Sequence, residues 1–312
     1  MSAEEHVEHV GGLKEIEEVI ACSLCDERRV QPLFTPRSKR PGRWHYHVVR
    51  CPTCGLLYRQ PGIRPERLGV LYEKKTYKTF LTGHYAEERL RRYELVMEAF
   101  DPLFADGGGR RVFDFGCGAG LFLDLADARG FEPYGVDLSE ESVAEARRKP
   151  SGRNAYFGTP QDTPEIAAGG FDVVTLWSVL AHLPRPVEDF ALMRSLLAPG
   201  GALLVLTVNA NSLKLKADRD AWNGFTPNHL KFFSPQTLPL LLRRAGFGAV
   251  VFRPMYGDRI EAGDAPLGRR TIRRMKRVID DGNRGNMMRA VAFVEPDAPA
   301  RWGWERDALV LS

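Results

Sequence analysis

A mostly apolar strand that runs directly into three alternating glycines is the feature that most restricts how this chain can fold. Residues 111–120 read RVFDFGCGAG, and a helical pattern follows over residues 121–129. Glycine adopts backbone angles that other residues resist, and the first turn of a helix has free amide groups, so a ligand can approach the main chain closely here. A glycine run alone is weak evidence, since turns after strands commonly contain glycine.

Strands and helices alternate after this turn. Further strands are expected over residues 133–138, 154–158, 171–179, 202–208, 249–254 and 287–294. Strands joined by helices form a parallel sheet that is covered on both faces, so the pattern predicts an α/β fold with a doubly wound sheet. We expect three parts: an N-terminal module over residues 1–62, a helical connector over 63–104, and a main domain over 105–312 with a long insertion at 209–234.

An acidic residue accompanies the glycine turn. Asp137 ends the second strand, 17 residues after Gly120. Ligands of open α/β sheets bind beyond the carboxyl ends of the strands, where this carboxylate can accept both hydroxyl groups of a ribose. A dinucleotide fingerprint needs glycine at position 121, where this chain has Leu121,. The spacing therefore favours a nucleoside ligand without phosphates.

Five stretches, in this order, resemble the class I S-adenosylmethionine-dependent methyltransferase family: VFDFGCGAG, YGVDLS, FDVVTLWSVLAHLPRP, LLAPGGALLVLTVN and HLKFFSPQTLPLLLRRAGF. The resemblance covers residues 112–247 and implies a Rossmann-like, mostly parallel sheet of seven strands with S-adenosylmethionine as the cofactor. It implies that Asp137 holds the ribose and that Leu138 packs on the adenine. The other cofactor-binding residues that it implies are Tyr77, Asp114, Gly116, Cys117, Gly118, Gly120, Asp162, Trp177 and Ser178.

Some of these residues have a particular expected role or an alternative. Asp162 stands where the resembling enzymes often contact the adenine. Tyr77, with Tyr72 nearby, is expected to cover the cofactor as part of the connector and lid, or, equally, to be exposed or packed against a helix. Trp177 closes the pocket or, equally, belongs to the core. The Cys117 thiol is expected to be a small buried group rather than a nucleophile.

Four of the five cysteines form two C-x2-C pairs. The pairs are Cys22 with Cys25 and Cys51 with Cys54. Each pair can bind one face of a tetrahedral ion, and together they predict a zinc ribbon in the N-terminal module. A centre with four protein ligands has no open position for water, so this zinc would be structural. His45 and His47 lie in the same stretch and remain alternative ligands.

Methyl transfer to an acceptor that carries a proton requires a base, and histidine suits that task near neutral pH. His182 follows the fourth strand, and His229 lies in the insertion, which we place on the acceptor side. We prefer His229 because aromatic residues surround it in the sequence. His182 is the second candidate, although Ala181 stands where the resembling enzymes commonly have glutamate. The alternative role for His229 is to hold the insertion by hydrogen bonds.

Composition limits the choice of partners. With 44 basic and 40 acidic residues, the net charge of +4 does not by itself indicate a nucleic-acid partner,. There is neither a long apolar run nor a signal-peptide pattern, so we expect a cytoplasmic protein without a membrane span. The expected function is methylation of a small-molecule acceptor in biosynthesis, such as a sugar, a polyketide or a peptide-derived metabolite. Two alternatives stay open: a ribosomal RNA methyltransferase that uses the zinc ribbon and the basic stretch 269–277 to contact phosphates, and an inactive binding protein with this fold.

Overall fold

The computed structural model describes residues 17–18, 20–37, 46–64, 84–226, 228–253, 255 and 284–311. Three of the predicted features lie outside these residues: the lid tyrosines Tyr72 and Tyr77, the alternative ligand His45, and the basic stretch 269–277. Among the described helices, none combines the length and apolar character that a membrane span requires.

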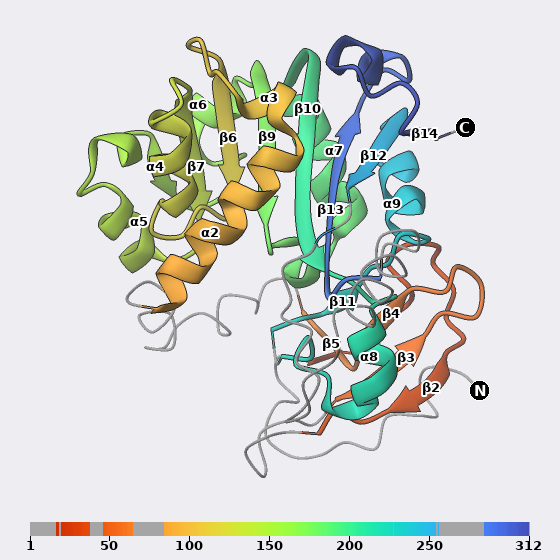
Figure 1. Cartoon of the computed structure of the whole chain (residues 1–312). Helices are drawn as coiled ribbons and strands as arrows, with labels where there is room; N and C mark the ends of the chain where they lie inside the picture. The colour runs from red at the N-terminus through yellow and green to blue at the C-terminus, as the bar shows by residue number, and fades with distance from the viewer. Residues whose placement is uncertain are drawn as a thin grey trace, which may run out of the picture.

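A central eight-stranded sheet has the order β14-β12-β13-β10-β9-β6-β7-β8 (Figure 1). Its strands are β6 (Arg111–Phe115), β7 (Glu132–Asp137), β8 (Ala155–Phe157), β9 (Phe171–Trp177), β10 (Leu197–Val208), β12 (Ala249–Arg253), β13 (Met287–Phe293) and β14 (Ala308–Val310). The strands from β6 to β10 run parallel, whereas β13 is antiparallel to both of its neighbours. The predicted mostly parallel, doubly wound sheet is confirmed. It has one strand more than expected, because β14 is a three-residue edge strand with too short a pattern to recognise.

Helices cover both faces of this sheet. They are α2 (His84–Ala99), α3 (Asp101–Phe104), α4 (Leu121–Asp127), α5 (Glu140–Ala146), α6 (Pro164–Ala167), α7 (Pro186–Leu196) and α9 (Leu238–Arg244). Helix α8 (Leu213–Asp218) instead lies in the insertion beside the second sheet (Figure 1). Short 3₁₀ segments are η3 (Pro150–Gly152), η4 (Leu180–His182), η5 (Arg219–Ala221) and η6 (Ala298–Trp302). Ser139 caps α5 as its sequence predicts, since its Oγ accepts a hydrogen bond of 3.2 Å from the Ser142 amide,.

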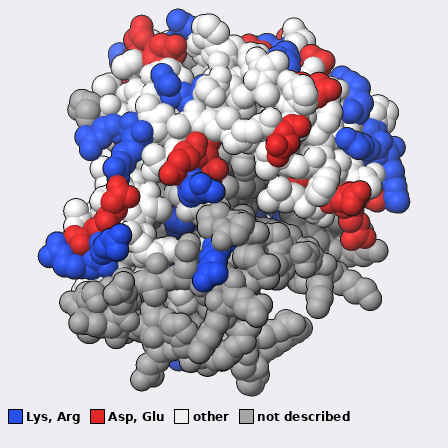
Figure 2. Space-filling model, turned by 180° about the vertical axis from the view of Figure 1, so that it is seen from behind, with Lys and Arg blue, Asp and Glu red and all other residues white. Residues whose placement is uncertain are grey.

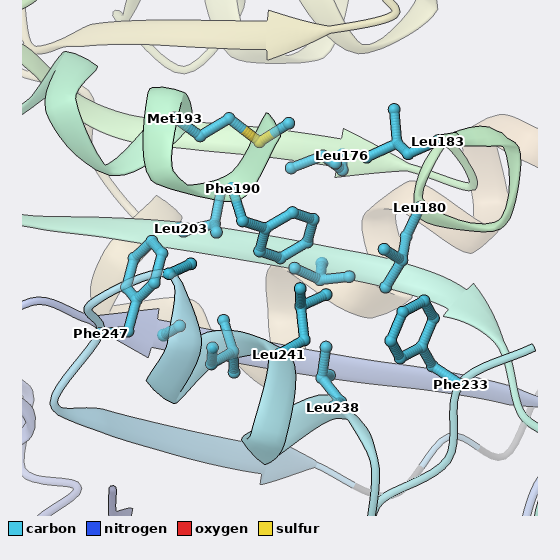
Figure 3. Packing of buried hydrophobic residues seen from close by; sticks show 14 of the residues in the cluster. Leu176, Leu180, Leu183, Phe190, Met193, Leu203, Phe233, Leu238, Leu241 and Phe247 are labelled. Carbon is cyan, nitrogen blue, oxygen red and sulfur yellow. The ribbon is translucent and has the colours of Figure 1, made fainter. Parts of the chain in front are cut away.

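Two hydrophobic layers hold the helices to the sheet. On one face, Phe190 and Met193 of α7 and Leu241 of α9 pack against strand residues such as Leu203 (Figure 3). On the other face, α2 and α4 contribute a second cluster that includes Phe122. Fully burying a side chain of this size contributes about 1.5–3 kcal/mol, so these layers fix the strand ends that carry the site.

The N-terminal module is joined to the insertion through a second sheet. Strands β2 (Gln31–Phe34), β3 (His47–Arg50), β4 (Leu57–Gln60) and β11 (Lys231–Phe232) form a four-stranded sheet in the order β11-β4-β3-β2, and β1 (Glu17–Glu18) pairs with β5 (Gly62–Ile63). Strand β11 comes from the insertion, and its register places Lys231 opposite Tyr58. The sequence analysis treated these segments as separate parts, whereas the sheet unites them.

We call the described residues of 20–64 and 209–234 together the cap. Its sheet is covered on both faces: Val48 packs in a cluster with Trp222 and Phe225 of the insertion, while Val49 belongs to the core shared with α7 and α9. Arg244 of α9 donates a hydrogen bond to the Leu24 carbonyl in the first cysteine knuckle. Figure 1 shows the cap at the end of the main sheet where β10 ends and β13 begins. It therefore borders the carboxyl ends of the parallel strands.

Candidate active site and metal centre

The glycine turn has a backbone that only glycine adopts easily. Gly116, Gly118 and Gly120 have φ angles of +83°, +52° and +76°,. A Cβ atom on Gly116 would lie 2.7 Å from a methyl carbon of Val179, so this position is also sterically closed. The amides of Gly116 and Cys117 both donate to the Val136 carbonyl, at 2.9 Å each. The turn is thus held tightly against the end of β7.

Asp137 ties the glycine turn to the start of α5. One carboxylate oxygen accepts the Gly118 amide and the other accepts the Ser139 amide, each at 2.8 Å. Burial raises the pKa of this carboxyl group, while the two amides act in the opposite direction,. Each carboxylate oxygen has two lone pairs, so both retain an acceptor position for a ligand hydroxyl.

Asp114, at the end of β6, is fully enclosed. The hydroxyl of Thr175 donates to it at 2.8 Å, and the side chain is 2% exposed. Burial raises the pKa of Asp114 to about 8, and the nearby charge of Asp137 adds to the rise,. The group is therefore mostly protonated at neutral pH, and a cation bound beside it would favour release of that proton.

Trp177 and Cys117 lie in the core rather than on an open surface. The Trp177 ring packs against Tyr93 of α2 and Phe122 of α4, with centroid distances of 4.3 and 4.9 Å. The Cys117 thiol lies over Gly135, where a Cβ atom would be 2.7 Å from the sulfur, and burial raises its pKa. The core alternative for Trp177 and the buried, non-nucleophilic expectation for Cys117 agree with this packing.

Ser178, directly after β9, has a φ of +65°, which is unusual for a residue other than glycine,. Its amide donates to the Leu206 carbonyl at 2.8 Å, and this bond holds the strained residue in place. Unusual backbone angles of this kind cluster at functional sites. Ser178 thus lies at the carboxyl end of β9, at the edge of the sheet where the candidate site is located.

Two exposed apolar side chains stand at the ends of β7 and β8. Leu138 is 48% exposed and Phe157 is 55% exposed. Phe157 pairs with Asp137 in the sheet, and Leu138 is the next residue along the chain from Asp137. Phe157 was missed by the sequence analysis, and its only signal is its position at a strand end. Asp162 lies in the following turn, where its carboxylate accepts a hydrogen bond of 2.6 Å from the Thr159 hydroxyl.

The two candidate bases, His182 and His229, are in contact although they lie in separate segments. Their ring centroids are 4.8 Å apart, with the rings inclined at 69°. His182 Nδ1 lies 2.9 Å from the Asn228 carbonyl oxygen, and His229 Nδ1 lies 2.6 Å from the Gly224 carbonyl oxygen. A carbonyl oxygen only accepts hydrogen bonds, so the Nδ1 atom of His229 carries the proton and its Nε2 has a lone pair.

Burial keeps both histidine rings neutral. It lowers the pKa of His182 to about 3 and that of His229 to about 4,. Hydrogen bonds to the backbone of Asn228 and of Ser178 oppose the shift of His182, so main-chain groups engage this ring twice. For His229 the Gly224 carbonyl is the one opposing contact. His229 therefore has fewer main-chain contacts of this kind than His182.

Arg89 of α2 brings a positive charge to the same region. Its charge lowers the pKa of Asp137 and also that of His182. The sequence analysis missed Arg89 because a single arginine in an amphipathic helix carries no distinguishing signal.

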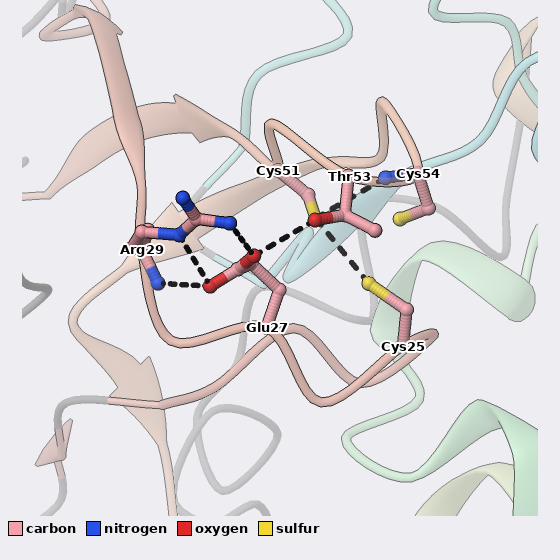
Figure 4. Close-up of polar contacts among 6 residues, drawn as sticks. All are labelled: Cys25, Glu27, Arg29, Cys51, Thr53 and Cys54. Carbon is pink, nitrogen blue, oxygen red and sulfur yellow. Dashed lines mark hydrogen bonds and ion pairs between the residues drawn. The ribbon is translucent and has the colours of Figure 1, made fainter.

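The four predicted metal ligands converge in the cap. Their sulfur atoms all lie within 4.8 Å of one another, with Cys22 and Cys54 at 3.5 Å. The sulfurs of Cys25 and Cys51, which Figure 4 shows, are 3.4 Å apart. A tetrahedral zinc with Zn–S bonds of about 2.3 Å places its sulfurs about 3.8 Å apart, which this set fits. The Cys54 amide points at the Cys51 sulfur at 3.4 Å, as expected for a metal knuckle.

A carboxylate connects the two cysteine knuckles. Glu27 accepts hydrogen bonds from Arg29 at 2.7 Å and from the hydroxyl of Thr53, in the second knuckle, at 2.8 Å (Figure 4). Both bonds hold the pKa of Glu27 well below its usual range. Beneath the knuckles, the Tyr58 hydroxyl is buried and has no hydrogen-bond partner among the described residues. The chemistry of this donor set matches a closed zinc centre.

The model of a methyltransferase domain matches residues 83–250, which is more than half of the chain. The chain therefore belongs to this methyltransferase family. The ubiquinone biosynthesis O-methyltransferase of Aromatoleum aromaticum is 32% identical over 152 residues, which cover 44% of this chain and 64% of that protein. The same-named protein of Azoarcus sp. is 32% identical over 156 residues, covering 46% and 66%. The chain thus spans slightly under two thirds of the length of these relatives.

A solved structure supports the fold. A chain in the complex between the Haloferax volcanii Trm112 methyltransferase activator and the putative methyltransferase aligns with a TM-score of 0.53. The sequence identity is 16%, and the alignment covers 71% of this chain and 98% of that chain. At this identity the likeness concerns the fold alone.

Proposed function

We propose that this chain transfers the methyl group of S-adenosylmethionine to a hydroxyl group of a small-molecule acceptor. The observation that carries the proposal is the positive-φ turn from Gly116 to Gly120, tied through its Gly118 amide to the Asp137 carboxylate. A backbone of this shape accommodates a nucleoside that carries an amino acid, and family membership and the O-methyltransferase relatives agree with that ligand.

The cofactor side is formed by residues at the ends of β6, β7 and β8. Asp137 would accept hydrogen bonds from the ribose hydroxyls, and Leu138 and Phe157 would cover the adenine. Asp114 and the glycine turn would lie beside the methionine part. When bound, S-adenosylmethionine supplies an electrophilic methyl group on a positively charged sulfur.

The acceptor side is formed by the histidine pair. His229 would accept the acceptor's hydroxyl proton at Nε2, since Nδ1 is occupied by the Gly224 carbonyl. With a pKa of about 4, the ring is a weak base at neutral pH, so it would take up the proton only as the acceptor hydroxyl becomes more acidic during the reaction,. His182 would hold the His229 ring by edge contact.

The four cysteines would bind a structural zinc. The ion would join the two knuckles and thereby order the cap sheet, which continues into the insertion through β4 and β11. It would take no part in the reaction, because four protein ligands leave no position for a substrate.

The described charge on one face of the molecule gives the RNA alternative no support. In the view from behind the molecule, Lys and Arg side chains alternate with Asp and Glu over the described part of the surface (Figure 2). Neutralising several phosphates requires a contiguous basic surface. The described part of this face offers none.

Calorimetric titration with S-adenosylhomocysteine tests the proposal. We expect one site per chain, and Asp137→Asn should weaken binding by about 1–3 kcal/mol, because the amide removes part of the acceptor capacity. Asp127→Asn is the matched control, since this acid lies at the end of α4 in an exposed ion pair of 3.2 Å with Arg153. No heat of binding to the unchanged chain would refute the proposal.

A further inference from the structure

The cap contains a buried lysine that has no part in the reaction described above. Lys231, in β11, is 2% exposed, although lysine is almost never fully buried without partners,. Its ammonium group donates to the Leu183 carbonyl at 3.1 Å and to the Pro184 carbonyl at 2.8 Å. Both carbonyls belong to the loop that follows η4, so the side chain spans from the cap to the methyltransferase domain.

A main-chain bond acts on the same loop from the preceding residue. The Leu230 amide donates to the Ala181 carbonyl at 2.7 Å. Together, Leu230 and Lys231 engage carbonyls on both sides of His182. The other member of the histidine pair, His229, precedes them directly in the chain. One three-residue segment, 229–231, thus supplies the proposed base and the groups that hold its partner ring in place.

This segment is anchored on the metal side of the cap. Lys231 lies opposite Tyr58 in β4, and the Arg59 amide donates to the Leu230 carbonyl at 2.9 Å. Strand β4 follows the second cysteine knuckle after two residues. A rigid path of strand pairing therefore leads from the cysteine cluster to the histidine pair.

Burial lowers the pKa of Lys231 to about 8, and the negative charges of Asp189 and Glu188 in the first turn of α7 oppose this shift,. Hydrogen bonds from a charged donor are stronger than those of a neutral donor, and a buried ammonium that loses its acceptors is costly. The two carbonyls are therefore held firmly rather than merely contacted.

We propose that Lys231 is a positioning residue that fixes the His182–His229 pair and couples it to the cysteine centre through β11 and β4. The expected effect on kcat rests on the proposed function. The proposal also has a structural consequence that does not depend on activity: the histidine rings should change their environment when Lys231 is replaced.

The test replaces Lys231 by methionine, which keeps the length and removes the donors. We expect kcat to fall by about 10-fold to 100-fold, as for a small misplacement of a catalytic group, with affinity for S-adenosylhomocysteine within about 2-fold of the unchanged chain. Lys231→Arg, which restores a charged donor, should recover part of kcat. Lys216→Met is the matched control, because Lys216 lies exposed on α8 in the same insertion.

Nitrogen-15 NMR of the imidazole groups provides the readout that does not require turnover. The unchanged chain should show two neutral rings for His182 and His229, and Lys231→Met should shift both signals while Lys216→Met shifts neither. If methionine prevents folding, Lys231→Gln, with a shorter donor, should give an intermediate shift and an intermediate kcat. Unchanged histidine signals and unchanged kcat in a folded Lys231 variant would overturn the proposal. An unchanged chain that transfers no methyl group, but whose signals respond as expected, would instead refute the proposed function alone.

Discussion

The two sides of the candidate site are built in different ways. The proposed cofactor side comes mostly from one continuous stretch, 114–139, in which main-chain atoms and the Asp137 carboxylate hold the glycine turn, and β8 adds Phe157. The acceptor side is formed by side chains from η4, the insertion and β11, held by bonds between residues about 50 positions apart. A side formed by one stretch of chain tolerates changes elsewhere in the chain. A side formed by distant segments depends on the cap and on its proposed metal. Changes to the cap should therefore affect acceptor chemistry while leaving cofactor binding intact.

Loss of the metal should have the largest effect. In Cys22→Ser we expect the metal content, measured by elemental analysis, to fall from one zinc per chain to near zero. Structural zinc contributes on the order of 10 kcal/mol, so the cap should become sensitive to proteolysis. Cys117→Ser is the control, since this cysteine lies outside the cluster and should retain the zinc. A folded, protease-resistant cap without metal would contradict the assignment.

Closing the glycine turn should have the next largest effect, on the opposite side of the site. Gly116→Ala introduces a left-handed residue, which costs about 1–2 kcal/mol, and a Cβ atom 2.7 Å from Val179,. We expect affinity for S-adenosylhomocysteine to fall by at least about 10-fold. Gly109 has a similar φ of +79°, but a Cβ atom added there would have nothing within 4 Å. Gly109→Ala therefore carries the backbone cost without the steric contact. Equal losses of affinity in both variants would argue against a close approach at Gly116.

The histidine pair should make stability depend on pH. The pKa values of about 3 and about 4 in the folded chain lie below the ordinary value of about 6.5, so the unfolded chain binds these protons first,. The histidine contribution is fully present above pH 6.5 and is lost as the pH falls toward 4. Asp114, with its raised pKa, acts in the opposite direction, so the comparison with a variant is essential.

Urea unfolding of the unchanged chain and of His229→Asn between pH 7 and pH 5 measures this contribution. Asparagine keeps a donor for the Gly224 carbonyl and removes the titrating nitrogen. We expect the variant to lose about 1–3 kcal/mol less than the unchanged chain over this range. Parallel pH profiles would show that His229 is not a buried neutral ring.

Asp114 should produce the smallest effect. Since its pKa is raised to about 8, binding of the positively charged cofactor should release part of a proton near pH 7,. Titrations in buffers of different ionisation enthalpy should detect this release, and affinity should rise by less than about 10-fold between pH 6.5 and pH 8.5. In Asp114→Asn both signals should disappear, and a remaining pH dependence would assign the proton to another group.

The contrast between the contiguous side and the long-range side of the site also explains what the sequence alone could predict. Strands β6 and β7, the turn and Asp137 are contiguous, and each carries a local signal of apolar run, glycine or acid at a strand end. Strand β11 has two residues and pairs with a strand more than 170 positions earlier, so no periodicity reveals it. The contact between His182 and His229 depends on that pairing.

Two further features resisted prediction for physical reasons. Lys231 is an ordinary surface residue by type, and only its carbonyl partners show that it is buried. Trp177 ends a strand at the ligand edge, yet its ring turns into the layer beneath α2, because Tyr93 and Phe122 offer it an aromatic pocket. Both outcomes depend on tertiary partners that local sequence does not specify.

The most direct test of the account is transfer of labelled methyl from S-adenosylmethionine to a panel of phenolic small molecules by the unchanged chain and by His229→Asn. The account predicts transfer by the unchanged chain, a loss of at least about 100-fold in the variant, and equal affinity of both for S-adenosylhomocysteine. Transfer at an unchanged rate by His229→Asn would contradict it.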